Sequence, residues 1–445
     1  MNTESSLLLT DLYQFTMLQG YYERGMHDTA VFEFFVRKLR PGRGFLLAAG
    51  LEQVLDFLEQ ARFSAEELDW LRDSGRFSSG FINWLANWRF QGDVLAMPEG
   101  TPFFPNEPVL RVVAPMSQAQ LVETRLINLL HFQTLIASKA VRCVLAAPGK
   151  LLVDFGLRRA HSAEAGLLAA RAAYLAGFSG SATVLAGSYF GIPVFGTMAH
   201  SFVQAHDSES EAFRGFAHAQ PGNVVLLIDT YDSEAAAHKV VALGRELAKE
   251  GIPIKGVRLD SGDLGEQARR VRRILDEGGL PSATIFASGD LDESVLRDLL
   301  AQGAPIDGFG VGTRLDTSAD QPYLDCAYKL QEYAGTPRRK RSPGKATWPG
   351  RKQVWRRYDG QGRMCGDIIT LEDDPQKGEP LLMPAMRGGR RLAQPSLEEA
   401  RLAAAAHMRR LPEPLAALRE DETYPVEIAP ALQRLAEKLD AGERQ

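Results

Sequence analysis

The middle of the chain repeats a pattern in which a short apolar run is followed by a polar loop and then by an amphipathic stretch. Seven such runs are candidate β-strands: 151–155, 183–187, 193–197, 224–229, 254–260, 284–288 and 306–312. Helical stretches rich in Ala, Leu, Arg and Glu, such as 233–250 and 264–277, separate most of them. This alternation predicts parallel strands joined by helical crossovers. Seven runs favour a (β/α) barrel, and an open doubly wound sheet is the alternative.

The regions on either side of this repeat follow different patterns. The N-terminal part mixes short helices with strand-like runs, and the predicted elements are a helix from Leu12 to about Gly25, a strand at 31–36, a helix at 46–59 and a long helix at 118–142. Near Gly335 a third zone begins, with the loop TPRRKRSPGK (336–345), a strand at 352–358 and charged helices up to Gln445. The run from Arg338 to Arg341 is either a solvated loop or a lid that grips an anion.

Three domains follow from these patterns. We expect an α/β N-terminal domain over 1–120 and a (β/α) barrel over 121–335. The segment 336–445 should supply a basic loop, a strand and helices that pack back on the N-terminal domain.

Composition narrows the class of protein without indicating its chemistry. The chain has 445 residues, 45% hydrophobic and 24% charged, which is typical of a globular protein. Its net charge of -5 gives no basic field for general nucleic-acid binding. No apolar run approaches the roughly 18 residues of a membrane helix, and Met1 to Ser6 lacks the pattern of a signal peptide. Three cysteines without a close pair suit a reducing cytoplasm.

Polar residues follow nearly every predicted strand of the central repeat. They are Asp154, Gly156, Arg158, Arg159, Thr197, His200, Asp229, Thr230, Asp232, Arg258, Asp260, Ser261, Gly262, Asp263, Ser288, Gly289, Asp290, Gly310, Gly312, Thr313 and Arg314. Each Gly-Asp turn alone is ordinary turn and cap chemistry. Together these strand ends would meet at one mouth of a barrel, where Gly and hydroxyl side chains hold phosphate. The neighbouring carboxylates suit Mg²⁺ carried by substrate phosphates.

His200 is the candidate nucleophile or base at this mouth. A lone histidine is usually structural, but His200 follows Thr197 by three residues among small side chains (GTMAHS). A neutral imidazole in that position is suited to attack phosphorus or to accept a proton. His161 and His206 lack this setting.

A set of motifs resembles the nicotinate phosphoribosyltransferase family. LLTDLYQFTM, FGLRRA, FGTMAHSFV, LLIDTYDS, GVRLDSGDL, GVGT and SPGKATWPGRKQVWR stand in the family's order between residues 7 and 356. The resemblance implies a type II phosphoribosyltransferase fold, an α/β N-terminal domain on an irregular (β/α) barrel. It also implies a homodimer with composite active sites. The implied reaction joins nicotinate to phosphoribosyl pyrophosphate, with Mg²⁺ present and ATP as co-substrate.

The resemblance also implies a role for each motif residue. Tyr13 would stack on the nicotinate of the partner subunit, Thr197 and Arg258 would contact nicotinate, and His200 would be autophosphorylated. The residues implied for phosphoribosyl pyrophosphate, by motif or by their position at strand ends, are Arg159, Asp260, Ser261, Gly262, Gly289, Gly312 and Thr313. The metal ligands are not identified.

One segment departs from the family pattern. Ser181, Ala182 and Thr183 stand where Thr, Ser and Asn are expected, and FGLRRA continues with His161 instead of a glycine turn. We therefore expect the phosphate contacts from the 181–183 turn to differ.

Other functions compete with this interpretation. A sister enzyme acting on nicotinamide would need an acidic partner for the amide, and one acting on quinolinate would need more basic residues. A sugar-phosphate aldolase or isomerase would need a Schiff-base lysine or an acid–base pair, but Lys255 begins its strand instead of ending it. A catalytically inactive scaffold would not need Thr197, His200, Arg258 and Thr313.

Overall fold

The computed structural model describes residues 6–419 and 423–442, so most of the N-terminal segment considered for a signal peptide lies outside it. The chain forms two compact units. One combines residues 1–138 with 323–445, and the other spans residues 139–322.

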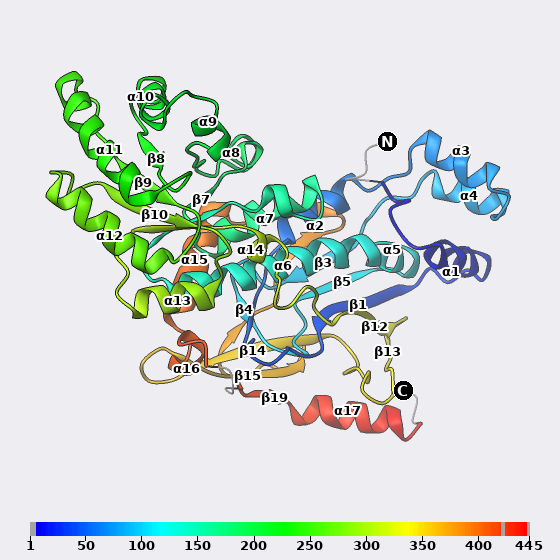
Figure 1. Cartoon of the computed structure of the whole chain (residues 1–445). Helices are drawn as coiled ribbons and strands as arrows, with labels where there is room; N and C mark the ends of the chain where they lie inside the picture. Colours follow the sequence, from blue (N-terminus) through cyan, green and yellow to red (C-terminus); the bar gives the residue numbers. More distant parts are fainter. Residues whose placement is uncertain (1–5, 420–422, 443–445) are drawn as a thin grey trace. The chain divides into compact units, whose positions relative to one another are not determined.

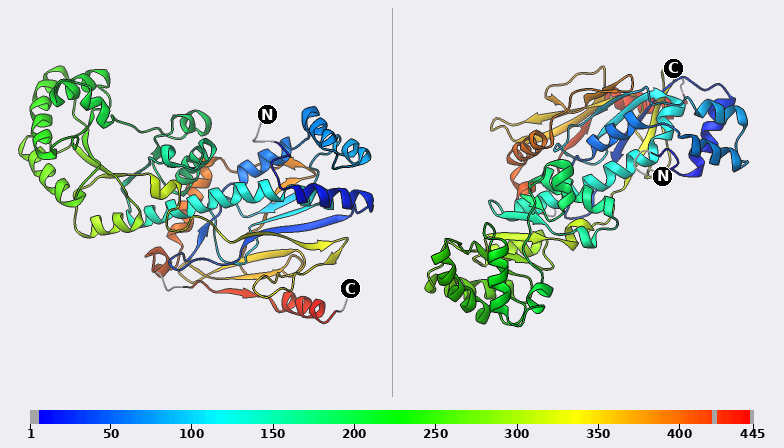
Figure 2. Two further views of the ribbon diagram at one scale, coloured as in Figure 1. Left: turned by 45° about the vertical axis from the view of Figure 1, so that its right-hand side comes forward. Right: turned by 90° about the horizontal axis from the view of Figure 1, so that it is seen from above.

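The second unit is built on a parallel sheet of six strands (Figure 1). The strand order is β7-β6-β11-β10-β9-β8. The strands are β6 (Leu151–Asp154), β7 (Gly180–Ser181), β8 (Val225–Leu227), β9 (Gly256–Leu259), β10 (Thr284–Ser288) and β11 (Gly308–Val311). The helices are η1 (Leu157–Arg159), α7 (Ala163–Ala176), α8 (Val184–Phe190), α9 (His200–Gln204), α10 (Glu209–Ala219), α11 (Ser233–Leu247), η2 (Ala248–Glu250), α12 (Leu264–Glu277), α13 (Glu293–Ala301) and α14 (Thr313–Asp316). Figure 2 shows α10 to α13 along the outer side of the strands.

The sheet is an irregular, incomplete barrel. Of the seven predicted strands, one forms a helix and another contributes only a single β-bridge. Residues 183–187 were expected to form a strand, but they open α8, and the strand in this region is Gly180–Ser181. A short apolar run does not distinguish a strand from a buried helical turn. In the 193–197 run only Val194 pairs, with Ser181. The other five predicted runs contain β6, β8, β9, β10 and β11.

The first unit is built on a seven-stranded sheet with the strand order β13-β12-β1-β5-β3-β17-β18. A four-stranded sheet, β16-β14-β15-β19, and a β2-β4 pair complete it. The strands are β1 (Thr29–Val36), β2 (Leu46–Leu47), β3 (Asp93–Ala96), β4 (Pro102–Phe103), β5 (Leu110–Pro115), β12 (Cys326–Tyr333), β13 (Thr336–Pro337), β14 (Lys352–Tyr358), β15 (Met364–Leu371), β16 (Glu379–Pro380), β17 (Met383–Arg387), β18 (Arg390–Arg391) and β19 (Val426–Ile428). The helices are α1 (Leu12–Glu23), α2 (Leu51–Gln60), α3 (Ala65–Asp73), α4 (Ser79–Leu85), α5 (Met116–Leu121), α6 (Glu123–Ala146, which continues into the second unit), α15 (Leu397–Arg409), α16 (Glu413–Ala416) and α17 (Pro430–Asp440).

The boundaries between the units differ from those predicted. Strand β12 falls inside the predicted 121–335 barrel, but it pairs antiparallel with β1 along its length. The Phe32 and Tyr328 rings stack across that pair at 5.0 Å between centroids. Pairing with a strand almost 300 residues earlier is a tertiary event that local periodicity does not encode. In the C-terminal segment, β17 pairs with β3 of the N-terminal region.

Two predicted helices of the first unit are interrupted. The 46–59 stretch begins as strand β2, and α2 starts only after Gly50, whose φ is +99°. A Cβ at Gly50 would lie 2.7 Å from the Leu129 carbonyl oxygen, so the close approach of these backbones requires glycine. The 118–142 stretch is divided into α5 and α6.

Among the described residues, α6 alone has the length and composition to cross a membrane. Two-thirds of its most apolar window (67%) is buried inside the protein, as expected for a core helix. The helix is therefore weak evidence for a membrane span.

Candidate functional site

The carboxyl ends of the parallel strands gather most of the predicted site residues at one edge of the second unit. The pairing aligns Leu259 with Ala287, Ser288 with Gly310 and Val311 with Asp154. The residues that follow these pairs therefore emerge side by side. Ligands of open and closed α/β sheets bind at this edge.

Arg258, at the end of β9, connects several of these strand ends. Its Nε donates to Ser288 Oγ at 2.9 Å, and its Nη2 donates to Asp260 Oδ1 at 2.9 Å. Its Nη1 lies 3.3 Å from the carbonyl oxygen of Met198, next to Thr197. The guanidinium lies 5.4 Å from the centroid of the Phe155 ring. The arginine is thus held by a cation–π contact with Phe155 and by hydrogen bonds to residues at the strand ends.

Asp260 is the carboxylate at the centre of this arrangement. Burial by itself raises its pKa, but hydrogen bonds from Ser288 and Arg258, together with the charge of Arg258, hold the pKa below its usual value. Its backbone N–H donates to Asp229 Oδ2 at 2.7 Å, and Ser261 Oγ donates to the same oxygen at 2.8 Å. Asp260 is therefore ionised and fixed, and Asp229 holds the loop that carries it.

His200 lies at the first position of α9, close to the same carboxylate. Its Nδ1 is 3.1 Å from Thr230 Oγ1, and its Nε2 is 3.8 Å from Asp260 Oδ2. The side chain is 39% exposed, so solvent and small molecules reach the ring. The histidine is thus oriented by a hydroxyl on one nitrogen while the other faces a carboxylate.

Two glycines with positive φ shape the loops after β9 and β10, and one of them, Gly289, allows the two loops to approach each other. Gly289 has a φ of +100°, and a Cβ there would lie 2.1 Å from the Asp260 carbonyl oxygen. Gly262 has a φ of +76°, and a Cβ there would lie 2.3 Å from Nε2 of Gln267, which donates to the Ser261 carbonyl. A side chain at Gly289 would separate these loops, whereas a side chain at Gly262 would displace the end of the Gln267 side chain.

The remaining predicted phosphate residues lie on the other half of the same edge. Gly312 and Thr313 follow β11, and a Cβ at Gly312 would lie 3.0 Å from the Phe155 carbonyl oxygen. Arg159 ends η1, after β6, with its side chain exposed and no ion-pair partner in the described chain. The structure brings both strand-end loops to the edge and leaves this guanidinium available for an anion.

Tyr13 belongs to the first unit, on α1, and its side chain is 48% exposed. It lines a hollow with Tyr21, Phe32, Tyr328 and Lys329. Tyr13 and the strand-end residues thus belong to different units.

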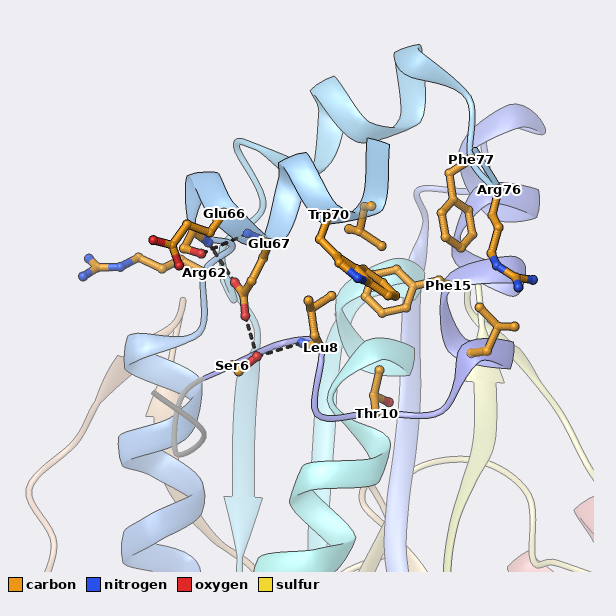
Figure 3. A pocket seen from close by; sticks show the side chains of 13 residues that line it. Ser6, Leu8, Thr10, Phe15, Arg62, Glu66, Glu67, Trp70, Arg76 and Phe77 are labelled. Atoms are coloured by element: carbon orange, nitrogen blue, oxygen red, sulfur yellow. Dashed lines mark hydrogen bonds between the residues drawn. The ribbon is translucent and has the colours of Figure 1, made fainter. Parts of the chain in front are cut away.

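Other residues of the same N-terminal motif line a separate cavity of about 1020 Å³, with Leu8, Thr10 and Phe15 on one side and Trp70 and Phe77 on the other (Figure 3). None of the strand-end residues contributes to this largely apolar cavity.

Some contributors to the site were weakly indicated by the sequence. Ser288 is marked in the sequence only as a polar residue after an apolar run, and Asp229, Thr230 and Phe155 lie within the LLIDTYDS and FGLRRA motifs, which assign them no individual role. The basic loop at 336–345 is partly held by ion pairs within the first unit. Arg339 Nη1 pairs with Asp440 Oδ2 at 2.7 Å, and Arg341 Nε lies 3.3 Å from Asp440 Oδ1.

The site offers oxygen ligands but no preformed metal cage. Within residues 6–419 and 423–442, no group of three His, Cys, Asp or Glu side chains could hold a metal ion. Asp229 Oδ1 is buried and has no hydrogen-bond partner in that same part of the chain. One free carboxylate oxygen fits a Mg²⁺ ion that arrives on substrate phosphates and retains most of its water.

Both units resemble known proteins. Residues 8–131 match the model of the nicotinate phosphoribosyltransferase N-terminal domain, and residues 151–335 match the nicotinate phosphoribosyltransferase family model. A nicotinate phosphoribosyltransferase of Mycobacterium tuberculosis is 49% identical over 425 residues, covering 95% of this chain and 91% of that protein. The Bacillus subtilis enzyme is 40% identical over 380 residues, covering 83% and 77%. The crystal structure of human nicotinic acid phosphoribosyltransferase has a TM-score of 0.86 at 30% identity, covering 97% of this chain and 100% of that one.

Proposed function

The chain belongs to the nicotinate phosphoribosyltransferase family, and we propose that it joins nicotinate to C1 of the ribose of phosphoribosyl pyrophosphate in NAD biosynthesis. The products are nicotinate mononucleotide and pyrophosphate. The observation that carries this proposal is the match of both family models to a chain whose strand-end edge holds an oriented arginine among hydroxyls and glycines.

Arg258 is the proposed partner of the nicotinate carboxylate. Ser288 and Asp260 hold two of its nitrogens, and Nη1 makes only a long contact with the Met198 carbonyl. That donor is the one free to turn toward a substrate carboxylate. Thr197 is next to this contact and would add a hydroxyl beside the ring. A charge-assisted bond of this kind discriminates a carboxylate from an amide, and so favours nicotinate over nicotinamide.

The transfer step needs charge neutralisation and alignment more than covalent chemistry. As the bond from C1 to pyrophosphate breaks, positive charge develops on the ribose and negative charge on the leaving group. The pyridine nitrogen then forms the new bond to C1. The loops after β9, β10 and β11 would hold the phosphates through Ser261, Gly262, Gly289, Gly312 and Thr313, with Arg159 facing the phosphates. Mg²⁺, when bound, supplies further charge neutralisation, and Asp229 is suited to hold it.

His200 is the proposed acceptor of a phosphoryl group from ATP. With Nδ1–H donating to Thr230 Oγ1, Nε2 retains its lone pair for attack on the γ-phosphorus. The phosphorus–oxygen bond to ADP breaks as the nitrogen–phosphorus bond forms. The phosphorylated side chain would carry about -1.5 to -2 charges beside Arg258 and substrate-bound Mg²⁺. Hydrolysis of this phosphohistidine would couple ATP use to transfer.

We also propose a homodimer in which Tyr13 completes the partner's site. Its half-exposed ring on α1 is available for stacking. Inactive Tyr13→Ala chains mixed with inactive Thr313→Ala chains should then recover activity, because one site of each mixed dimer contains neither change. Lack of recovery after verified subunit exchange would show that each chain builds its own site.

One assay tests the function directly. The purified protein is incubated with nicotinate, phosphoribosyl pyrophosphate and Mg²⁺, with and without ATP, and products are identified by mass spectrometry. Nicotinate mononucleotide should form, and ATP should stimulate its formation. Nicotinamide and quinolinate serve as competing substrates, and preference for either of them would reject the nicotinate assignment.

A further inference from the structure

A buried pair of aspartates lies beneath the half of the strand-end edge that carries Arg159 and Thr313. Asp316 ends α14 and is 1% exposed, and Asp154 ends β6 and is 0% exposed. Gly156 packs directly on Asp316, since a Cβ there would lie 2.1 Å from Asp316 Cγ. The two carboxyl groups are in contact with the same short stretch of backbone.

The two aspartates have unequal sets of hydrogen-bond donors. Asp154 Oδ1 accepts from the Gly156 N–H at 2.8 Å, and Oδ2 accepts from Ser181 Oγ at 2.7 Å. No donor in the described residues reaches either carboxyl oxygen of Asp316. An ionised Asp316 would be a buried, unsolvated charge beside a second carboxylate, which is strongly unfavourable.

No cation within residues 6–419 and 423–442 donates a hydrogen bond to Asp316. Helix α14 packs against α7 and η1 (Figure 1). On η1, Arg158 and Arg159 are exposed, and on α14 Arg314 Nη1 pairs with Asp292 Oδ2 at 2.8 Å. The guanidinium of Arg171 on α7 lies over the Phe190 ring at 5.9 Å. Burial raises the pKa of Asp316 well above its usual value, and the negative charge of Asp154 raises it further.

We propose that Asp316 carries a proton at neutral pH and donates it to Asp154, and that this shared proton fixes the loops that grip the phosphoribosyl group. The role of the pair rests on the proposed function. Asp154 then accepts bonds from three segments that are far apart in sequence: the turn that leads to Arg159, the Ser181 turn and the helix that begins at Thr313. A protonated carboxyl supplies the one donor that the geometry lacks. Asp154 and Asp316 are positioning residues, since neither is exposed to substrate.

The pair also accounts for the segment that departs from the family pattern. The Ser181 hydroxyl donates its hydrogen bond to Asp154, and the backbone N–H of Thr183 donates to Ser181 Oγ at 2.9 Å. The 181–183 turn is therefore bonded to the buried pair.

Two substitutions separate a donated proton from simple packing. Asp316→Asn keeps the shape and offers an N–H donor to Asp154, whereas Asp316→Leu keeps similar bulk but offers none. We expect the KM for phosphoribosyl pyrophosphate to stay within about twofold of wild type in Asp316→Asn and to rise about tenfold or more in Asp316→Leu, with a smaller effect on the KM for nicotinate. Asp298→Asn, at an exposed position of α13, is the matched control and should behave as wild type.

Infrared spectroscopy tests the proton without relying on activity or on the folding of Asp316→Leu. Wild-type protein at neutral pH should show a carbonyl stretch of a protonated carboxylic acid that is missing from Asp316→Asn. The buried Glu107, whose pKa is also raised by burial, would contribute equally to both spectra and cancels in their difference. Absence of this band in wild type, or equal KM defects in the Asn and Leu variants, would overturn the proposal. If wild type shows the band but transfers no phosphoribosyl group, the proton assignment stands and the proposed function fails.

Discussion

The two halves of the strand-end edge use the same residue type in opposite charge states. After β9 and β10, Asp260 is bonded to Arg258 and Ser288 and has a lowered pKa, although burial alone would raise it. After β6 and β11, burial and the neighbouring Asp154 raise the pKa of Asp316. The local donors, and not the identity of the side chain, decide which aspartate is ionised. The half after β9 and β10, here called the charged half, presents the ionised Asp260 to ligands. Beneath the other half, the buried Asp316 holds the loops that carry Arg159 and Thr313.

The largest expected effect is at the charged half. His200→Asn retains some hydrogen bonding to Thr230 but removes the nucleophile, so ATP hydrolysis and ATP stimulation should be abolished. A residual ATP-independent transfer should survive, because alignment and neutralisation depend on other residues. Acid-labile, base-stable labelling from γ-labelled ATP should vanish with the activity. His206→Asn, with a ring bonded to the Phe202 carbonyl, is a control that should keep both. ATP hydrolysis that continues in step with product formation in His200→Asn would make the histidine structural.

Arg258→Ala should have the next largest effect. Loss of a desolvated charge-assisted pair costs on the order of 2–4 kcal/mol in kcat/KM, or roughly 30- to 1000-fold. Discrimination between nicotinate and nicotinamide should collapse with it, as measured by competition between the two pyridines. Arg258→Lys keeps the charge but loses the planar fork, and should recover only part of the preference. A variant that keeps the wild-type preference for nicotinate would mean that another residue reads the carboxylate.

Gly289→Ala tests whether the charged half depends on close backbone approach. Gly289 and Gly303 both have positive φ, but a Cβ at Gly303 meets nothing within 4 Å. Each substitution should destabilise by about 1 kcal/mol from backbone strain, and Gly289→Ala by about 1–3 kcal/mol more from the clash with Asp260. Chemical denaturation measures this difference. Equal destabilisation of the two variants would show that the loops can move apart freely.

The pH dependence of stability provides the smallest and most direct contrast between the halves. Because the folded pKa of Asp316 is raised, the folded state binds the extra proton, and stability should fall as pH rises from the unfolded aspartate pKa through the folded one. Asp260 has the opposite effect on stability. Its contribution to the free energy of unfolding is present above the pKa that it has in the unfolded chain, and it is lost as the pH falls through the lowered pKa of the folded state. Urea midpoints measured across pH should therefore show a smaller alkaline decline in Asp316→Asn and a smaller acid decline in Asp260→Asn. The same pH profile in wild type and both variants would remove the contrast.

Local sequence was enough to predict five of the six parallel strands and the polar residues that follow them. Apolar runs ending in polar residues marked β6, β8, β9, β10 and β11, and the motifs marked His200, Arg258 and the glycine turns. These features depend on neighbours within about ten residues, which is the range over which periodicity and turn chemistry operate. The 183–187 run was mistaken for a strand because a short apolar segment is compatible with either structure.

Only the tertiary structure decided which of these residues act on one another. Ser288 and Asp260 are 28 residues apart, and Asp154 and Ser181 are 27 apart, yet each pair is hydrogen bonded. Nothing in the sequence distinguishes Asp316, and its burial without a donor is visible only in the fold, where Gly156 packs against it. Strand β12 likewise pairs with β1, which lies almost 300 residues earlier in the chain. The sequence determined the residue types and the local elements, whereas charge state, pairing and orientation depend on what the fold brings within hydrogen-bond distance and what it removes from water.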